Sequence, residues 1–416
     1  MEMTEAYRKN EIYRWLLIVI GVGVACLAGF QATAQAYDGM IYGKVITSGT
    51  SYTGLIRWDK EEVLWTDLFN AAKTDNSYKD LVPEQKKEND SWLGYDWSFS
   101  GIWEDKRPSH QFTCQFGDIA SLTPLPRSQA RIVFKNGGKI TVSGEGYNDI
   151  GGRVQVLDEE LGVVSIEWDK IERIEFMPTP PRLKTVFGSP MYGTVEGMRK
   201  QTFTGFIVWD NDERLSTDPL DGTGPDGKVA IRFGDIASIE KSGKGSLVKL
   251  RSGREFMLHG SNDVNSGNRG VFVAVDGVGI VKLPWSAFRR VTFASPGQPA
   301  EYQQFKSPGI LSGTVYPIEG SELAGRIIFD IDEAMDLEMV EGKDDDVEYI
   351  VPLRNIRRIK PKNFDYSMVE LRSGESLLLG GQRDVSSQNG GVLVFIKGAK
   401  EPKYVAWKNI NEIVFD

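Results

Sequence analysis

The residues best suited to chemistry are acidic, and they recur in three short clusters. The clusters begin at Asp59, Asp210 and Asp330, and each carries further Asp or Glu residues within the next three positions. Carboxylates two residues apart on an extended segment point to one side, so Asp210 with Asp212, or Asp330 with Asp332, could offer oxygen ligands to Ca²⁺. No cluster has the D-x-D-x-D-G loop of a calcium site, and the alternative is a solvated turn that ends a strand.

A second acidic position recurs later in the chain, ahead of glycine-containing segments. Its three occurrences are Asn148-Asp149, Asn262-Asp263 and Arg383-Asp384. Asp and Asn side chains bind nearby backbone groups in tight turns, and glycine supplies positive φ angles, so a hairpin loop explains this element without a ligand.

Three tryptophans, Trp168, Trp285 and Trp407, stand at one position of a pattern that occurs three times. Each is flanked by alternating apolar residues, as in VSIEWD around Trp168. This context favours a role as anchors of the hydrophobic core over a role as platforms on which sugars stack.

One aromatic segment, residues 71–112, has no counterpart elsewhere in the chain. Its candidate binding residues are Trp92, Tyr95, Trp97, Phe99 and Trp103. Three of them alternate along the sequence, as residues on one face of a strand do. Exposed aromatic groups of this kind mark contacts with glycans or proteins, so we predict that these five bind a partner. The alternative is a loop that folds them back over the protein.

Other kinds of catalysis find little support in the sequence. The two histidines, His110 and His259, have no nucleophile motif around them, and the chain has neither a Gly-rich phosphate loop nor an H-E-x-x-H motif. We therefore expect a protein that is not an enzyme and that needs no cofactor, Ca²⁺ being the one candidate. The alternative is a glycan hydrolase that uses a carboxylate pair, because such pairs are not local in sequence.

The first 36 residues are typical of a secretory signal peptide. Basic residues within 1–14 precede an apolar run from Trp15 to Phe30, and QATAQA offers small-x-small cleavage sites at Ala34 and Ala36. We expect export to the periplasm or the extracellular space and no membrane span after cleavage; the alternative is an uncleaved N-terminal anchor. Cys114 would then be the remaining cysteine, either a small buried residue or a thiol that pairs between chains.

The elements that must hold these residues are β-strands. Short runs of β-branched and aromatic residues, such as TGFIVWD, GVFVAV and GGVLVFI, are bounded by Gly, Asp and Asn. Several such runs at regular spacing predict an all-β protein of the barrel or sandwich class.

Internal repetition predicts the domain organisation. Segments that begin at Ile41, Met191 and Leu311 share their glycines and a closing aspartate, and a later segment recurs in the same three places. We therefore expect a signal peptide at 1–36 and three tandem repeats at 37–180, 181–300 and 301–416. The two halves of each repeat resemble one another, so each repeat would contain two units, a size at which five short strands can close a small barrel.

The segment GTVYPIEGSELAGRIIFDIDEAMDLEMVEG resembles the first motif of Sm-like small β-barrels. The resemblance places Asp332 at the acidic position, Met335 at the Met and Asp336 at the Asn that contacts RNA in that family, with Arg354-Asn355 in place of the later Arg-Gly. It implies a small five-stranded barrel. Overall, the chain is similar to uncharacterised exported bacterial repeat proteins.

Charge and export together indicate the kind of partner. The net charge of −9 argues against binding of nucleic acid, and 40% hydrophobic residues indicate a folded protein. We expect a non-catalytic module that binds a protein or a glycan of the cell envelope, or that scaffolds an assembly there.

Overall fold

The structure, a computed structural model, describes residues 37, 39–59, 61–83, 110–184 and 186–416. These residues form an all-β fold of antiparallel sheets, which confirms the all-β part of the predicted fold class. Each helix in the described part of the chain is a 3-10 turn of three to five residues.

Burial along the strands alternates as the sequence pattern requires. In β11 (Tyr192–Gly197), every second residue is buried, and Val195 is fully buried. Successive side chains of a strand point to opposite faces, so this alternation gives the strand one core face and one outer face. Strands that are covered on both faces, such as β28 (Val392–Phe395), carry continuous apolar runs instead.

The first set of strands, β1–β10, contains the aromatic segment between β3 and β4. Its elements are β1 (Tyr42–Thr47), β2 (Ser51–Trp58), β3 (Leu68–Lys73), η1 (Ser77–Leu81), β4 (His110–Gln115), η3 (Phe116–Asp118), β5 (Ile119–Leu125), β6 (Gln129–Phe134), β7 (Lys139–Ser143), β8 (Val154–Asp158), β9 (Gly162–Ile166), η4 (Trp168–Lys170) and β10 (Ile171–Phe176).

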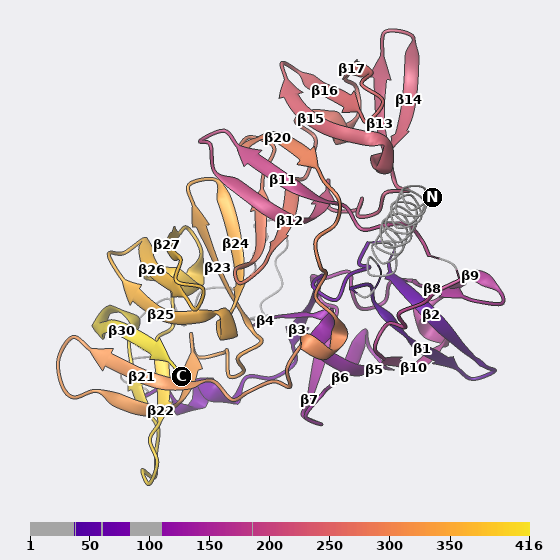
Figure 1. The fold of residues 1–416 in the computed structure, drawn as a ribbon. Helices are drawn as coiled ribbons and strands as arrows, with labels where there is room; N and C mark the ends of the chain where they lie inside the picture. Colours follow the sequence, from indigo (N-terminus) through magenta and orange to yellow (C-terminus); the bar gives the residue numbers. More distant parts are fainter. Residues whose placement is uncertain (1–36, 38, 60, 84–109, 185) are drawn as a thin grey trace, which may run out of the picture.

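The second set, β11–β20, lies at the top of the molecule in Figure 1. After β11 it contains β12 (Thr202–Trp209), β13 (Pro219–Gly224), β14 (Gly227–Arg232), η5 (Phe233–Asp235), β15 (Ile236–Ser242), β16 (Gly245–Leu250), β17 (Glu255–Leu258), η6 (Asn262–Val264), β18 (Val271–Val275), β19 (Gly279–Leu283) and β20 (Phe288–Phe293).

The third set, β21–β30, follows the turn η7 (Tyr302–Gln304) and lies beside the other two (Figure 1). Its further elements are β21 (Ser312–Pro317), β22 (Leu323–Phe329), β23 (Met339–Asp344), β24 (Val347–Pro352), η8 (Leu353–Asn355), β25 (Ile356–Pro361), β26 (Tyr366–Leu371), β27 (Ser376–Gly380), η9 (Arg383–Val385), β28, β29 (Lys403–Val405), η10 (Trp407–Asn409) and β30 (Ile410–Phe415).

Corresponding strands pair in the same order in the three sets. The first set runs β4-β3-β7-β6-β5-β10-β1-β2-β8-β9. The second and third sets repeat these pairings with strand numbers higher by ten and twenty, except that the β13–β14 hairpin meets β17 only through the bridge between Thr223 and His259. None of the sheets closes on itself, so the expected closed barrels are not found. The strands of the first set fall instead into two groups of five. One group contains β1, β2, β8, β9 and β10, and the other contains β3–β7, which lie between β2 and β8 in the chain.

The hydrophobic core is continuous between the second and third sets. β19 pairs with β24 across the boundary, and buried residues of both sets belong to one cluster. Phe203 of β12 lies edge-on to Tyr349 of β24, with 6.2 Å between ring centroids. The first set has its own core, to which the segment before β21 contributes Tyr302 and Phe305 and the third set contributes Leu337.

The repeated tryptophans lie in or beside these cores. Trp285 and Trp407 are buried and Trp168 is half-buried. Each ring meets an aromatic ring at the end of β2, β12 or β22, at centroid distances of 5.9, 6.2 and 6.0 Å. Their position agrees with anchors of the core.

Candidate functional site

The aromatic residues predicted to bind a partner, Trp92, Tyr95, Trp97, Phe99 and Trp103, lie outside the described residues. The acidic clusters lie within them, in the turns after β2, β12 and β22. Asp59, Asp210 and Asp330 each have a positive φ angle there, of 41°, 50° and 50°. Asp tolerates this backbone better than most residues, which explains why an aspartate ends each strand.

Another carboxylate, further along the chain, accepts two backbone hydrogen bonds at the end of each of these turns and so closes the turn. Asp67 accepts hydrogen bonds from the backbone N–H groups of Val63 and Leu64, both at 2.8 Å. Asp218 and Glu338 accept the equivalent pairs of N–H groups at 2.7 to 2.9 Å. The acidic residues are therefore in part structural, because they satisfy backbone donors that the turn leaves without a strand partner.

The second recurring acidic position binds the strand that follows each of these turns. Asp149, Asp263 and Asp384 accept the N–H of β3, β13 or β23 at 2.5, 2.6 and 2.7 Å. The carbonyls of Asp149 and Asp263 also accept from the indoles of Trp58 and Trp209, both at 2.9 Å. Burial raises the pKa of Asp149 and of Asp384 to about 7. These contacts are structural, but the element is not the expected hairpin loop, because the strands on either side of it, such as β7 and β8, do not pair with each other.

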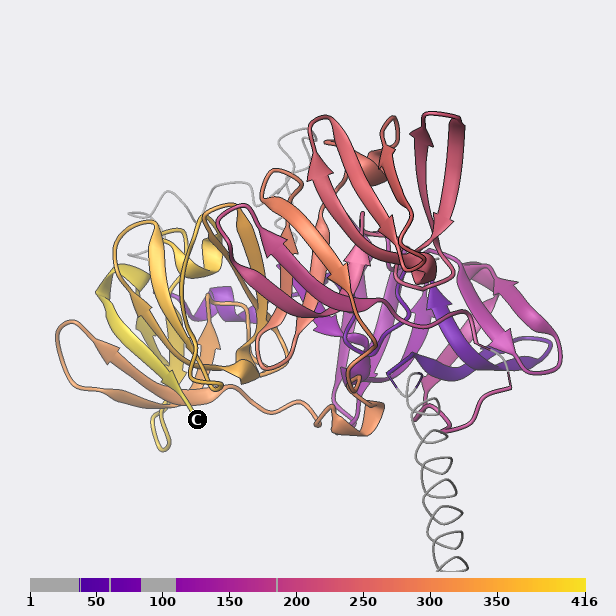
Figure 2. The same cartoon turned by 45° about the horizontal axis from the view of Figure 1, so that its top comes forward.

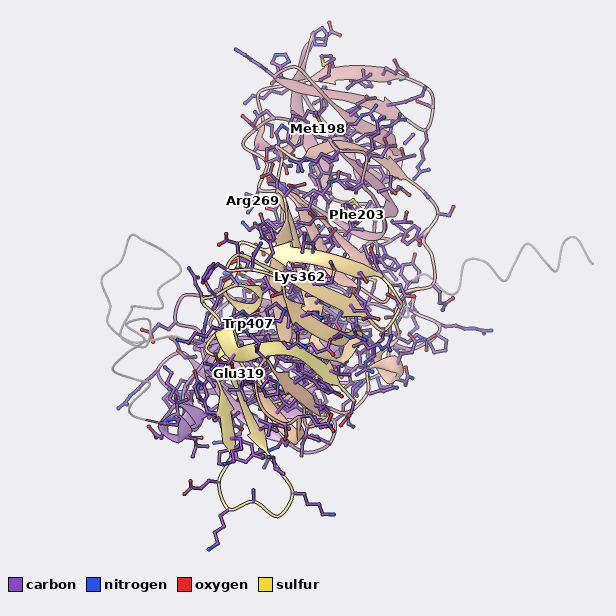
Figure 3. The ribbon with its side chains drawn as sticks, turned by 90° about the vertical axis from the view of Figure 1, so that its left-hand side faces the viewer. Met198, Phe203, Arg269, Glu319, Lys362 and Trp407 are labelled. Carbon is purple, nitrogen blue, oxygen red and sulfur yellow. The ribbon has the colours of Figure 1, made fainter. Side chains whose placement is uncertain are left out.

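The cluster of the second set brings Asp210 and Asp212 together with Glu213. Their carboxylate oxygens lie within 4.8 Å of one another. The guanidinium of Arg269 (Figure 3) lies 3.3 Å from Asp210 and 2.6 Å from Asp212. Burial, and then the neighbouring Asp212 carboxylate, raise the pKa of Glu213 to about 9. Arg269 therefore already compensates the charge of this cluster, and a metal ion would have to compete with it.

The cluster of the third set is divided between two cations. Asp330 binds the guanidinium of Arg383 at 2.9 Å. Asp332 binds Lys73 of the first set at 3.1 Å, and the same ammonium lies 2.5 Å from Glu338. Burial acts to lower the pKa of Lys73, but the two carboxylates outweigh it and raise that pKa. Asp330 and Asp332 are thus held by different basic residues and do not face a shared ion.

The cluster of the first set meets a basic residue of the second. Arg214 lies 3.2 Å from Glu62 and 3.5 Å from Asp67, and all three side chains are less than 10% exposed. Conversely, Arg57 of the first set forms an ion pair with Asp218 of the second set, at 3.1 Å. Burial raises the pKa of Glu62 well above its usual range, with Arg214 opposing the shift. Two turns from different sets are therefore fastened to each other by reciprocal ion pairs.

A cavity of about 920 Å³ lies where the three sets meet. Its lining includes Gln115 from the first set, Phe206 from the second and Arg354 from the third, with Phe305 from the connecting segment. Arg354 donates to Asp118 at 2.6 and 3.1 Å and to Gln115 at 2.8 Å.

Three of the positions of the Sm-like resemblance, Asp336, Arg354 and Asn355, line this cavity. Asp336 accepts from the N–H of Gly309 at 2.8 Å, and Asn355 donates to the carbonyl of Val278 at 3.2 Å. Arg354, described above, binds the first set. These side chains make contacts within the protein, which leaves them poorly placed to take up RNA. Sequence reasoning did not find the cavity, because its lining comes from segments far apart in the chain.

Comparison with known protein families and with curated proteins finds no match to this chain. Within the described residues, none of the helices has the length and apolar character that a membrane-spanning helix requires.

Proposed function

We propose that this chain is an exported, non-catalytic β-repeat protein that binds a protein or a glycan of the cell envelope, or scaffolds an assembly there. The observation that carries the proposal is that the recurring carboxylates bind groups within the protein. In each set they close a turn, and in each set they also bind a basic residue of another set. Carboxylates used in this way hold turns and neighbouring sets together, which supports a structural role for them.

The three sets of strands are, in this proposal, three tandem repeats at 37–180, 181–300 and 301–416. The shared order of strand pairing supports it, as do the shared glycines at close strand approaches. A Cβ at Gly54, Gly205 or Gly325 would come within 1.9 to 2.3 Å of a backbone carbonyl oxygen of the neighbouring strand. Each group of five strands takes strands from both halves of the set's sequence, so the groups differ from the two successive units that the sequence predicts.

The alternative, a carboxylate-dependent glycan hydrolase, would need an acid and a second carboxylate that face each other across a substrate cleft. The best candidates are Asp212 and Glu213, because the pKa of Glu213 is raised to about 9 and Asp212 lies beside it. Arg269 already binds Asp212 at 2.6 Å, so the pair is occupied from within the protein. This arrangement favours the binding function.

One experiment separates the two functions. The mature chain, immobilised, is incubated with a solubilised envelope fraction, and the captured material and any newly released reducing ends are measured. A binding module captures a defined partner and releases no reducing ends. Release of reducing ends that disappears in Asp212→Asn and Glu213→Gln variants would establish the hydrolase instead.

The location and the aromatic site need tests of their own. N-terminal sequencing of the protein from the host's envelope should begin after Ala34 or Ala36 if the signal is cleaved, and at residue 1 if it remains as an anchor. Loss of the captured partner in a Trp97→Ala/Trp103→Ala variant with an unchanged melting temperature would support the predicted aromatic contact. Unfolding of that variant would support a loop that packs on the protein.

A further inference from the structure

The pairing of β19 with β24 is a sheet contact between two sets. Ile280 stands opposite Ile350, Val281 opposite Tyr349 and Lys282 opposite Glu348. The contact buries the outer strand, so that Ile280 is only 7% exposed. Lys282 and Glu348 add an ion pair at 3.5 Å. The pairing of β19 with β24 thus shows how the outer edge of β19 is covered by a strand of another set.

β9 is the counterpart of β19 in the first set, but its outer edge has no strand partner in the described residues. Val163 pairs with Leu157 of β8 as Ile280 pairs with Ala274 of β18, so the two residues are equivalent. Val163 is 56% exposed, against 7% for Ile280, and the adjoining Leu161 is 66% exposed. Apolar residues on an uncovered strand edge invite pairing with another strand.

β14 is the counterpart of β24 in the second set, and it too has a strand on one side only in the described part of the chain. Ala230 pairs with Asp221 of β13 as Ile350 pairs with Glu341 of β23, which makes Ala230 and Ile350 equivalent. In Figure 1, β14 lies at the top of the molecule and β9 at its right-hand side, so both edges face outward.

The two edges also complement each other in charge. The register of β19 with β24, transferred to β9 and β14, sets Val163 opposite Ala230 and Ser165 opposite Lys228. Arg232 then meets the turn between β8 and β9, which carries Asp158, Glu159 and Glu160. Basic residues along one edge and an acidic turn on the other favour association.

The other equivalent edges are less suited to this contact. β29, the counterpart in the third set, spans only three residues. β4, the counterpart in the first set, lies against the third set, where Gln111 donates to Glu341 at 2.8 Å.

We propose that β9 of one molecule pairs with β14 of a second copy of this chain, in the antiparallel register that β19 and β24 use within the chain. Each molecule carries one edge of each kind, so the contact is head-to-tail and builds closed rings or extended strings. This inference goes beyond the proposed function, because it concerns self-association and does not depend on any envelope partner.

The register can be tested by disulfide trapping in the full chain. Variants Val163→Cys and Ala230→Cys, each in a Cys26→Ser background, are mixed and oxidised; the native Cys114 is fully buried. Opposed residues on paired strands lie close enough for a disulfide, whereas residues two positions out of register do not. We expect a cross-linked heterodimer from this pair and none from Val163→Cys mixed with Lys228→Cys. Equal yields from both mixtures would overturn the proposed register.

Mass measurements test the association itself. By light scattering over about 1 to 100 µM, the wild type should shift from monomer towards larger species as mass action requires. Val163→Glu should remain a monomer, because it places a carboxylate on the paired edge. Leu378→Glu, at a 44% exposed apolar position of β27, is the matched control and should associate like the wild type. A wild type that stays monomeric throughout would overturn the proposal and would leave a strand of another protein as the occupant of β9.

Discussion

Lys73 offers a direct test of how the first and third sets are held together. Its ammonium, 8% exposed, lies between the carboxylates of Asp332 and Glu338, which are 5% and 3% exposed. A Lys73→Met variant keeps most of the apolar stem but leaves both acids without their cation. Removal of one partner of a buried pair typically costs about 3 to 5 kcal/mol. Glu338 keeps two backbone donors and Asp332 keeps Asn76, so we expect the lower end, a loss of about 3 kcal/mol.

The assay is urea unfolding followed by tryptophan fluorescence, at neutral pH and moderate salt. Lys170→Met is the matched control, because Lys170 and Asp169 form an exposed pair and its loss should change the unfolding free energy little. A triple variant, Lys73→Met/Asp332→Asn/Glu338→Gln, removes the uncompensated charge and should recover much of the loss. A cost below about 1 kcal/mol for Lys73→Met, the size expected of an exposed pair, would refute the reasoning.

Three further outcomes follow from the buried groups. Burial raises the pKa of Asp384 to about 7 from an ordinary value of 3.8, so the folded state holds a proton that the unfolded state loses. The stability that this group contributes is therefore present below its ordinary pKa of 3.8, falls as pH rises from there to about 7 and levels off above that, and Asp384→Asn should flatten the fall in urea midpoints measured from pH 5 to 8. Arg269 already binds the acidic cluster of the second set, so we expect the same melting temperature in Ca²⁺ as in chelator; a rise with Ca²⁺ would restore the predicted calcium site. Cys114 is fully buried, and burial raises its pKa, so a thiol reagent should modify it only at the rate of unfolding; immediate modification of the native protein would contradict this.

The sequence pattern was sufficient for the strands that bury apolar side chains. The runs TGFIVWD and GVFVAV correspond to β12 and β18, because alternating or continuous apolar residues leave few other ways to cover themselves. β13, with the sequence PLDGTG, could not be found in this way. Its proline, aspartate and glycines have low strand propensity, and it is extended because β14 pairs with it.

The acidic clusters were found from the sequence, but their partners were not. A repeated Asp-x-Asp pattern shows that carboxylates gather at a turn, and it predicts a metal ion as readily as a basic side chain. The cation that binds Asp332 is Lys73, which is 259 residues away in the chain. Only the packing of one set against another brings such groups together, and periodicity within a strand holds no information about that packing.

The ion pairs between sets make the position of each set in the chain matter. Two of the basic residues that neutralise these clusters belong to a different set, since Lys73 of the first set binds the third and Arg214 of the second binds the first, whereas Arg269 and Arg383 bind acids of their own sets. The positions equivalent to Lys73 in the second and third sets are Gly224 and Asp344. The positions equivalent to Arg214 in the first and third sets are Val63 and Ala334. A chain with two of its sets exchanged would therefore bury acids without their cations, although every strand could still form. These few charged side chains thus favour one order of the three sets, because any other order would bury carboxylates without their cations.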